Sequence, residues 1–309
     1  MKYLKAIASM IINDLRQNKK RSAARKGSAA YWTSHMVADE TFKDRESSLD
    51  HFHWRNAQYP GYIELMPVSG YDNKVIVDYG CGPGNDLVGF TEFSKPQKLY
   101  GLDVSKTALI ASEKRLKLHR GKIDLIHIEE NENKIPLPDK SVDLIHSSGV
   151  LHHCKNLDAI LMEFYRILKD DGQIQIMIYN YDSLWLHLYT AYMHQIERNL
   201  YADLDIRKAF KHTTDGPDCP ISKCYKSDEF TSYVEQFGFI GKLKGVSISL
   251  TELSILPKRF DAIQNRKLPR EHREFLSEII FDEKGWPLYK NQVAGIDSCF
   301  SLKKKQKKE

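Results

Sequence analysis

The stretch Val75-Ile-Val-Asp-Tyr-Gly-Cys-Gly-Pro-Gly-Asn-Asp86 decides the fold of this chain. Its first half is a short apolar strand pattern, and Gly80, Gly82 and Gly84 follow directly after it. Glycine lets the backbone turn sharply and approach a ligand without a Cβ atom in the way. Because open α/β sheets bind ligands beyond the carboxyl ends of their strands, this turn predicts a ligand site.

Strand and helix patterns alternate on the C-terminal side of the turn. Strand patterns occur at 98–105, 123–130, 141–149 and 173–180, and helix patterns occur at 105–119 and 157–169. Such alternation predicts βαβ units with right-handed crossovers, and therefore an α/β, doubly wound, mostly parallel sheet. Asp103 ends the second strand nineteen residues after Gly84. A carboxylate at this spacing accepts hydrogen bonds from the hydroxyls of a ribose.

The spacing of the glycines discriminates between cofactors. A dinucleotide site reads G-x-G-x-x-G and leaves room for a pyrophosphate, whereas this turn reads G-x-G-x-G with Asp78 before it and Pro83 inside it. An acid there disfavours a pyrophosphate and suits a ligand with an ammonium group. The segments VDYGCGPG and LDVS resemble the first two motifs of class I S-adenosylmethionine (SAM) dependent methyltransferases.

Two later segments carry the same resemblance. IPLPDKSVDLIHSSGVLHH is similar to the family's fourth-strand motif, and YRILKDDGQIQIMIYN is similar to the helix-to-strand turn that follows it. The resemblance covers residues 72–180 closely, with a core like that of type 11 and type 25 methyltransferase domains. It implies a Rossmann-like, mostly parallel seven-stranded sheet, with SAM as cofactor and S-adenosylhomocysteine (SAH) as product.

The resemblance also assigns cofactor contacts by position. The backbone of Gly80, Cys81 and Gly82 is expected to pass the methionine part, in a loop with Gly84 that Asp78 orders. Asp103 is expected to hold the ribose and Val104 the adenine ring. For the adenine amino group the family supplies an acid or amide before the fourth strand, and we favour Asn131 over Glu130 and Glu132. Ser147 and Ser148 are expected to face the methionine amino group through a carbonyl.

Two further contacts have alternative interpretations. Asp86 either binds the cofactor's ammonium group or caps the helix after the turn. The segment from Trp54 to Tyr59 is expected to fold over the cofactor, with Arg55 either paired to its carboxylate or in an ordinary surface ion pair.

A hydroxyl acceptor must lose a proton during methyl transfer, and histidine suits that task near pH 7. His152 and His153 follow the fourth strand on the side where the resemblance places the sulfonium methyl. We predict that one of them is the base, with His152 slightly favoured, and a purely structural role for the pair is the alternative. No spacing among histidines and cysteines matches a zinc motif, so no metal site is predicted.

Composition limits the cellular context and the partners. The chain has 309 residues, five cysteines and no apolar run long enough to cross a membrane, which favours a soluble cytoplasmic protein. Residues 1–26 and 303–309 carry net charges of +7 and +4, which leaves −6 for the body. The basic tails offer the one route to nucleic acid, and the acidic body argues against it. The oligomeric state stays open.

We expect four regions: a helical cap at 1–70, the SAM-binding core at 71–180, an aromatic-rich insertion at 181–226, and the end of the sheet with a helical insertion and basic tail at 227–309. The insertion is expected to roof an acceptor pocket, although its aromatic stripe also fits core packing. The predicted function is O-methylation of a small molecule such as a saccharide or natural-product intermediate. RNA or protein methylation and a SAM-binding scaffold without turnover are the alternatives.

Overall fold

The computed structural model describes residues 27–36, 40–119, 121–130 and 134–306. Asn131, Glu132, the whole N-terminal basic segment at 1–26 and residues 307–309 of the C-terminal tail lie outside the described residues. The predictions made for them are therefore not addressed by the structure.

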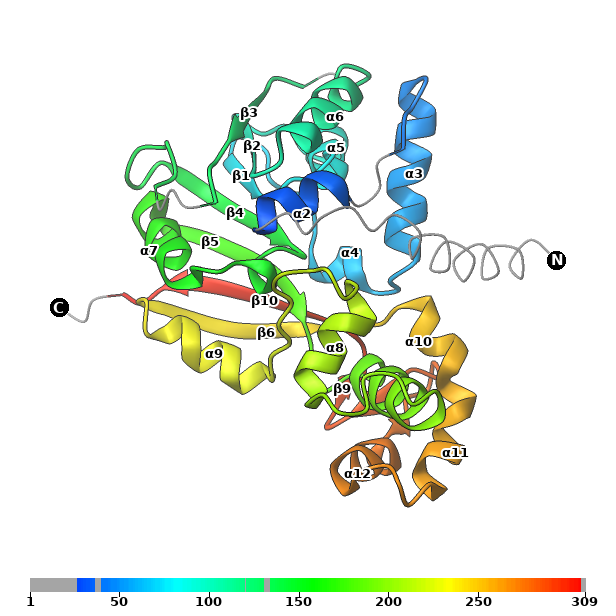
Figure 1. The fold of residues 1–309 in the computed structure, drawn as a ribbon. Helices are drawn as coiled ribbons and strands as arrows, with labels where there is room; N and C mark the ends of the chain where they lie inside the picture. The colour runs from blue at the N-terminus through cyan, green and yellow to red at the C-terminus, as the bar shows by residue number, and fades with distance from the viewer. Residues whose placement is uncertain (1–26, 37–39, 120, 131–133, 307–309) are drawn as a thin grey trace.

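A seven-stranded sheet forms the centre of the molecule, in the order β3-β2-β1-β4-β5-β10-β6 (Figure 1). Strands β1 to β5 run parallel, and β10 is antiparallel to both of its neighbours. The predicted Rossmann-like, mostly parallel sheet is thereby confirmed. The strands are β1 (Val75–Tyr79), β2 (Lys98–Asp103), β3 (Ile123–His127), β4 (Val142–Ser148), β5 (Leu168–Tyr179), β6 (Phe239–Ser247) and β10 (Asp297–Lys304).

Helices cover both faces of the sheet, because successive residues of a strand point to opposite sides. On β1, Ile76 packs in a core cluster with side chains of α3, α5 and α6, and Val77 packs in another with side chains of α7 and α9. Both residues are completely buried. The helices are α3 (Arg45–Ala57), α5 (Asn85–Phe93), α6 (Lys106–Leu116), α7 (Leu157–Ile167) and α9 (Ser227–Glu235).

Two short helices of the N-terminal region lie near the carboxyl ends of the parallel strands (Figure 1). They are α2 (Ser28–Ser34) and α4 (Tyr62–Leu65). The first turn of α2 is tied to the core, because Glu130 accepts hydrogen bonds from the backbone N–H groups of Ser28 and Ala29. A carboxylate at a helix N-terminus satisfies donors that have no partner inside the helix.

The C-terminal half adds a helical layer below the sheet in the view of Figure 1. It consists of the π-helix η2 (Trp185–Glu197), α8 (Ile206–Thr214), α10 (Leu250–Ile255), α11 (Arg259–Gln264) and α12 (Arg270–Glu278), with a short 3₁₀ turn at η3 (Leu256–Lys258). A second 3₁₀ turn, η1 (Leu151–His153), follows β4 in the core. The region 227–309, expected to hold the end of the sheet and a helical insertion, also contains a small three-stranded sheet of β7 (Ile280–Phe281), β8 (Pro287–Tyr289) and β9 (Gln292–Val293). Their two or three residues each are too few for a sequence period to show.

The aromatic stripe of the insertion belongs to a hydrophobic core. Leu188 and Tyr192 are buried in one cluster with Phe275 and Leu276 of α12. Of the two expectations for this stripe, a roof over an acceptor pocket and core packing, these two residues therefore fit core packing. No helix among the described residues is both long enough and apolar enough to cross a membrane.

Candidate functional site

A cavity of about 340 Å³ lies beyond the carboxyl ends of the parallel strands. The residues that follow β1, β2, β3 and β4 form its floor, and Tyr179 at the end of β5 and Asp297 at the start of β10 extend it. Ser28, Trp32 and Met36, in and after α2, also line it. The sheet topology thus places the cavity where the glycine turn predicted a ligand.

The glycine turn adopts backbone conformations that are unfavourable for residues with a Cβ atom. Gly80, Gly82 and Gly84 have φ angles of 79°, 53° and 85°, in the left-handed region that favours glycine. A Cβ atom on Gly80 would lie 2.3 Å from Cγ2 of Val150, and one on Gly84 would lie 2.5 Å from Oγ of Ser112. The turn is therefore held both by conformation and by close packing.

Asp103 joins the glycine turn to the end of β2. One carboxylate oxygen accepts the backbone N–H of Gly82 at 2.8 Å, and the other accepts that of Ser105 at 2.7 Å. Asp103 and Val104 both line the cavity. Each carboxylate oxygen retains a second lone pair, so Asp103 can order the turn and still accept hydrogen bonds from a ribose.

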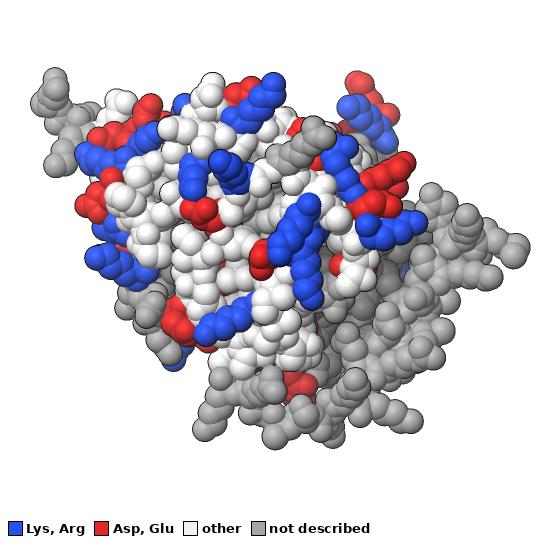
Figure 2. Space-filling view, turned by 90° about the horizontal axis from the view of Figure 1, so that it is seen from above, with Lys and Arg blue, Asp and Glu red and all other residues white. Residues whose placement is uncertain are grey.

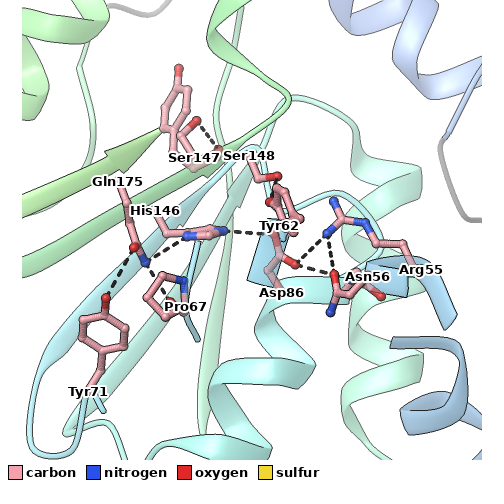
Figure 3. Close-up of polar contacts among 12 residues, drawn as sticks. Arg55, Asn56, Tyr62, Pro67, Tyr71, Asp86, His146, Ser147, Ser148 and Gln175 are labelled. Carbon is pink, nitrogen blue, oxygen red and sulfur yellow. Dashed lines mark hydrogen bonds and ion pairs between the residues drawn. The ribbon is translucent and has the colours of Figure 1, made fainter. Parts of the chain in front are cut away.

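A charged cluster occupies one end of the cavity (Figure 3). Asp86 lies 3.4 Å from the guanidinium of Arg55 and accepts a hydrogen bond from Nε2 of His146 at 3.0 Å. Burial opposes ionisation of Asp86, but Arg55 and His146 together hold its pKa below the usual range. Asp86 lies in the first turn of α5. Both Asp86 and Arg55 line the cavity, where a ligand can reach them.

The histidine of this cluster is held in one tautomer. The amide nitrogen of Gln175 donates to the carbonyl of Pro67 at 2.9 Å, which fixes the orientation of the amide. The same nitrogen lies 3.3 Å from Nδ1 of His146 and can only donate to it. Nε2 therefore carries the proton that Asp86 accepts. Nothing in the sequence singled out His146, because its partners come from distant segments.

Asp78 is the second acid at this end and lines the cavity beside Asp86. It is 2% exposed, and its Oδ2 has no hydrogen-bond partner among the described residues. Burial raises the pKa of Asp78 to about 7. A buried carboxyl with an unsatisfied oxygen is costly to maintain, and a ligand's ammonium group would relieve that cost.

The two serines at the end of β4 differ in position. Ser148 lines the cavity and exchanges a hydrogen bond with the hydroxyl of Tyr62. Ser147 is buried and donates to the carbonyl of Tyr79 at 3.0 Å, and its side chain is not among those that line the cavity. Tyr59, from the segment predicted to fold over the cofactor, lines the cavity, and burial raises its pKa.

The two predicted base candidates also differ. His152 is completely buried, lies outside the cavity lining, and has both ring nitrogens without a partner among the described residues. Its ring packs on that of Tyr179 with centroids 3.8 Å apart, and burial holds its pKa well below the usual value. His153 lines the cavity, and its Nδ1 donates to the carbonyl of Ile221 at 2.7 Å.

The lining of the cavity includes two acids that the sequence did not mark, and one of them lies beside His153. Asp215 accepts a hydrogen bond from the Tyr179 hydroxyl at 3.1 Å and lies 3.7 Å from Nε2 of His153. Burial raises the pKa of Asp297 to about 7. Asp215 follows α8 in a polar loop and Asp297 begins the last strand, so only the folded chain brings both acids to the lining of the cavity.

Residues 77–176 match the sequence profile of the methyltransferase domain family. An uncharacterized methyltransferase of Schizosaccharomyces pombe is 31% identical over 126 residues, which cover 39% of this chain and 45% of that protein. A malonyl-[acyl-carrier protein] O-methyltransferase of Marinomonas is 29% identical over 113 residues, covering 36% of this chain and 40% of that protein. The chain spans about half the length of the curated relatives it matches.

The fold recurs among solved structures. A chain of the Haloferax volcanii complex that contains the Trm112 methyltransferase activator superposes with a TM-score of 0.52 at 16% identity. The alignment covers 93% of this chain and all of that chain. At this identity the similarity concerns the fold.

Proposed function

We propose that this chain, which belongs to the class I SAM-dependent methyltransferase family through its domain at residues 77–176, transfers a methyl group from SAM to an oxygen atom of a small molecule. One observation carries the proposal. A single cavity contains the glycine turn with Asp103 at one wall and His153 with Asp215 at another. The cofactor and a hydroxyl acceptor thus have separate, chemically distinct walls.

The chemical groups of SAM match the wall that contains the glycine turn and Asp103. Asp103 is oriented by two backbone N–H groups and faces the place of the ribose. Val104 and Ile128 give apolar surface for the adenine ring. The α-carboxylate pairs with Arg55, and the α-ammonium group is attracted by Asp86 and Asp78, since opposite charges are strongly favoured at a partly buried site.

Methyl transfer from a sulfonium is a displacement in line with the breaking bond, so positioning supplies much of the catalysis. The acceptor oxygen forms a bond to the methyl carbon while the sulfur–methyl bond breaks, and neutral SAH leaves. The acceptor's proton must go to a base. In the structure Nδ1 of His153 carries a hydrogen, so its Nε2 has a free lone pair at the cavity wall. His153 is therefore the proton acceptor in this proposal.

A small acceptor is favoured over a macromolecular one by the form of the site. Trp32 and Met36 line the cavity from the α2 segment, which encloses the acceptor wall. Among the described residues on the face shown in Figure 2, Lys and Arg are interspersed with Asp and Glu and form no continuous basic surface. Binding to RNA relies on such a surface. Similarity to an O-methyltransferase of a malonyl group also supports oxygen as the accepting atom.

Calorimetric titration tests the cofactor, with SAH as ligand and NADH as control. We expect micromolar binding of SAH alone, followed by methyl transfer in a screen of hydroxylated small molecules. Transfer to RNA with a steep dependence on salt would replace the small-molecule proposal. Absence of SAH binding would leave a scaffold without turnover.

A further inference from the structure

Three side chains with metal-binding atoms meet at the wall of the cavity. A ring nitrogen of His153, a carboxylate oxygen of Asp215 and Sγ of Cys219 all lie within 4.8 Å of one another. They come from η1 and from the loop after α8, more than sixty residues apart in the chain. His153 and Asp215 line the cavity, and Cys219 is 1% exposed.

The tautomer of His153 is the one that a metal ligand needs. A carbonyl oxygen can only accept, so the 2.7 Å contact between Nδ1 and the carbonyl of Ile221 places the hydrogen on Nδ1. Nε2 is then unprotonated in the neutral ring, and it lies 3.7 Å from Oδ1 of Asp215. Metal-binding histidines are commonly oriented through a carbonyl in this way.

The other two ligands are also held in place. Asp215 accepts the hydroxyl of Tyr179 at 3.1 Å on Oδ1 and the hydroxyl of Ser222 at 2.6 Å on Oδ2. The thiol of Cys219 donates to the carbonyl of Ile221 at 3.2 Å. One carbonyl thus orients both the imidazole and the thiol. Hydrogen bonds that fix ligand carboxylates and imidazoles are a regular part of metal sites.

From this cluster we propose that His153, Asp215 and Cys219 bind one Zn²⁺ ion. Zinc accepts imidazole nitrogen, carboxylate oxygen and thiolate sulfur, and catalytic zinc sites combine three protein ligands with one open position. A carboxylate and a thiolate together balance the two charges of the ion, so the buried site carries no net charge. The lining positions of His153 and Asp215 leave the open position on the cavity side.

The role of the ion rests on the function proposed above. A hydroxyl group bound at the open position would lose its proton near neutral pH, because zinc lowers the pKa of bound water to about 7. In the metal-loaded chain Nε2 of His153 no longer takes that proton, which passes to solvent. The oxygen then attacks the methyl carbon as SAH leaves. Metal binding itself requires neither SAM nor turnover.

Cobalt titration of the full chain, stripped of metal and kept reduced, tests the site. Co²⁺ replaces zinc in such sites, and a thiolate ligand gives it a charge-transfer band in the near ultraviolet. We expect this band to saturate at one Co²⁺ per chain and to disappear on addition of Zn²⁺. Cys219→Ser should abolish the band and weaken Co²⁺ binding by at least roughly 100-fold, since loss of outer contacts alone costs 10–100-fold.

Cys224→Ser is the matched control. Cys224 is also a buried cysteine of the same loop region, but it packs in a separate core cluster with Tyr181 and Phe210. This variant should keep the band, and Asp215→Asn should keep the band while weakening Co²⁺ binding at least roughly 10-fold. Circular dichroism of each variant shows whether the protein is folded, and calorimetry with SAH tests cofactor binding separately.

The outcomes separate the two proposals. A band that is absent from the native chain, survives Cys219→Ser, or is lost in Cys224→Ser overturns the zinc site. If SAH still binds in that case, the proposed methyltransferase function stands. A cysteine-dependent cobalt band without SAH binding would support the zinc site and overturn the proposed function.

Discussion

The Arg55 guanidinium lies 3.4 Å from the carboxylate of Asp86, and both groups face the cavity. One comes from the end of α3 and the other from the first turn of α5. A ligand with adjacent ammonium and carboxylate groups can interact with both members of this pair. In the function proposed above, this pair recognises the amino-acid part of SAM.

Arg55→Gln should weaken SAH binding by roughly 10- to 100-fold, which is the cost of a hydrogen bond to a charged group. Calorimetry with 5′-methylthioadenosine, which lacks the amino-acid part, provides the control. Its affinity should not change. Because Arg55→Gln leaves Asp86 buried without its cation, the double variant Arg55→Gln/Asp86→Asn should recover lost thermal stability without recovering SAH affinity. Equal losses for both ligands would contradict the assignment.

SAH affinity should rise by up to roughly 10-fold between pH 6 and pH 8, because burial raises the pKa of Asp78 to about 7 and its charged form attracts the ammonium group. Asp78→Asn should remove this dependence, whereas Asp297→Asn should retain it. The same raised pKa means that the ligand-free fold loses stability as pH rises from about 4 to 7, since the unfolded chain releases the proton first. A flat affinity profile would exclude Asp78 from ammonium binding.

Asp103→Ala should weaken SAH and 5′-methylthioadenosine equally, by roughly 30- to 1,000-fold, because the variant loses charged hydrogen bonds to the ribose and to the turn. This pattern differs from that of Arg55→Gln, which affects SAH alone. Calorimetry with the two ligands measures it. Unchanged affinity would remove Asp103 from the ribose role.

His153→Gln should lower turnover by roughly 100-fold or more while SAH affinity stays constant, since a positioned base contributes about that much. His153 also orients the Ile221 segment, so circular dichroism must show that the variant is folded. Steady-state methyl transfer measures the effect once an acceptor is identified. Normal turnover in this variant would leave the reaction without a histidine base at this wall.

His152→Phe should act on stability rather than on binding. Burial holds the pKa of His152 well below its usual value, so only the unfolded chain takes up the proton as pH falls through about 6.5. The native protein therefore loses stability from this residue in acid, and the variant does not. In thermal melts, the melting temperature of the variant relative to that of the native chain should rise as the pH is lowered from 8 to 5. A constant difference would mean that His152 is charged in the folded state.

Much of the fold could be predicted because its signals are local. The strand at Val75–Tyr79 and the turn that begins at Gly80 follow from apolar patterning and from the special conformations of glycine. Asp103 could be predicted by its distance along the chain from the turn, since a βαβ unit has a nearly fixed length. The strands of the β7–β9 sheet could not, because pairs and triplets of residues carry no measurable period.

The contacts that specify chemistry depended on tertiary structure. His152 and His153 are adjacent in sequence and chemically equivalent there. In the fold, the ring of His152 is buried against Tyr179, whereas His153 lies at the cavity wall. Asp215 and Cys219 lie in an irregular loop whose path is set by packing on η1 and α2.

The sequence by itself determined the sheet, the glycine turn and the position of Asp103 at the end of β2, because each follows from backbone conformation and short-range spacing. Only the tertiary structure decided that Arg55 meets Asp86 and that His153 meets Asp215 and Cys219. These pairs join segments whose separation along the chain has no fixed relation to their distance in space. Side-chain burial and long-range packing bring them together, and those forces leave no local pattern in the sequence.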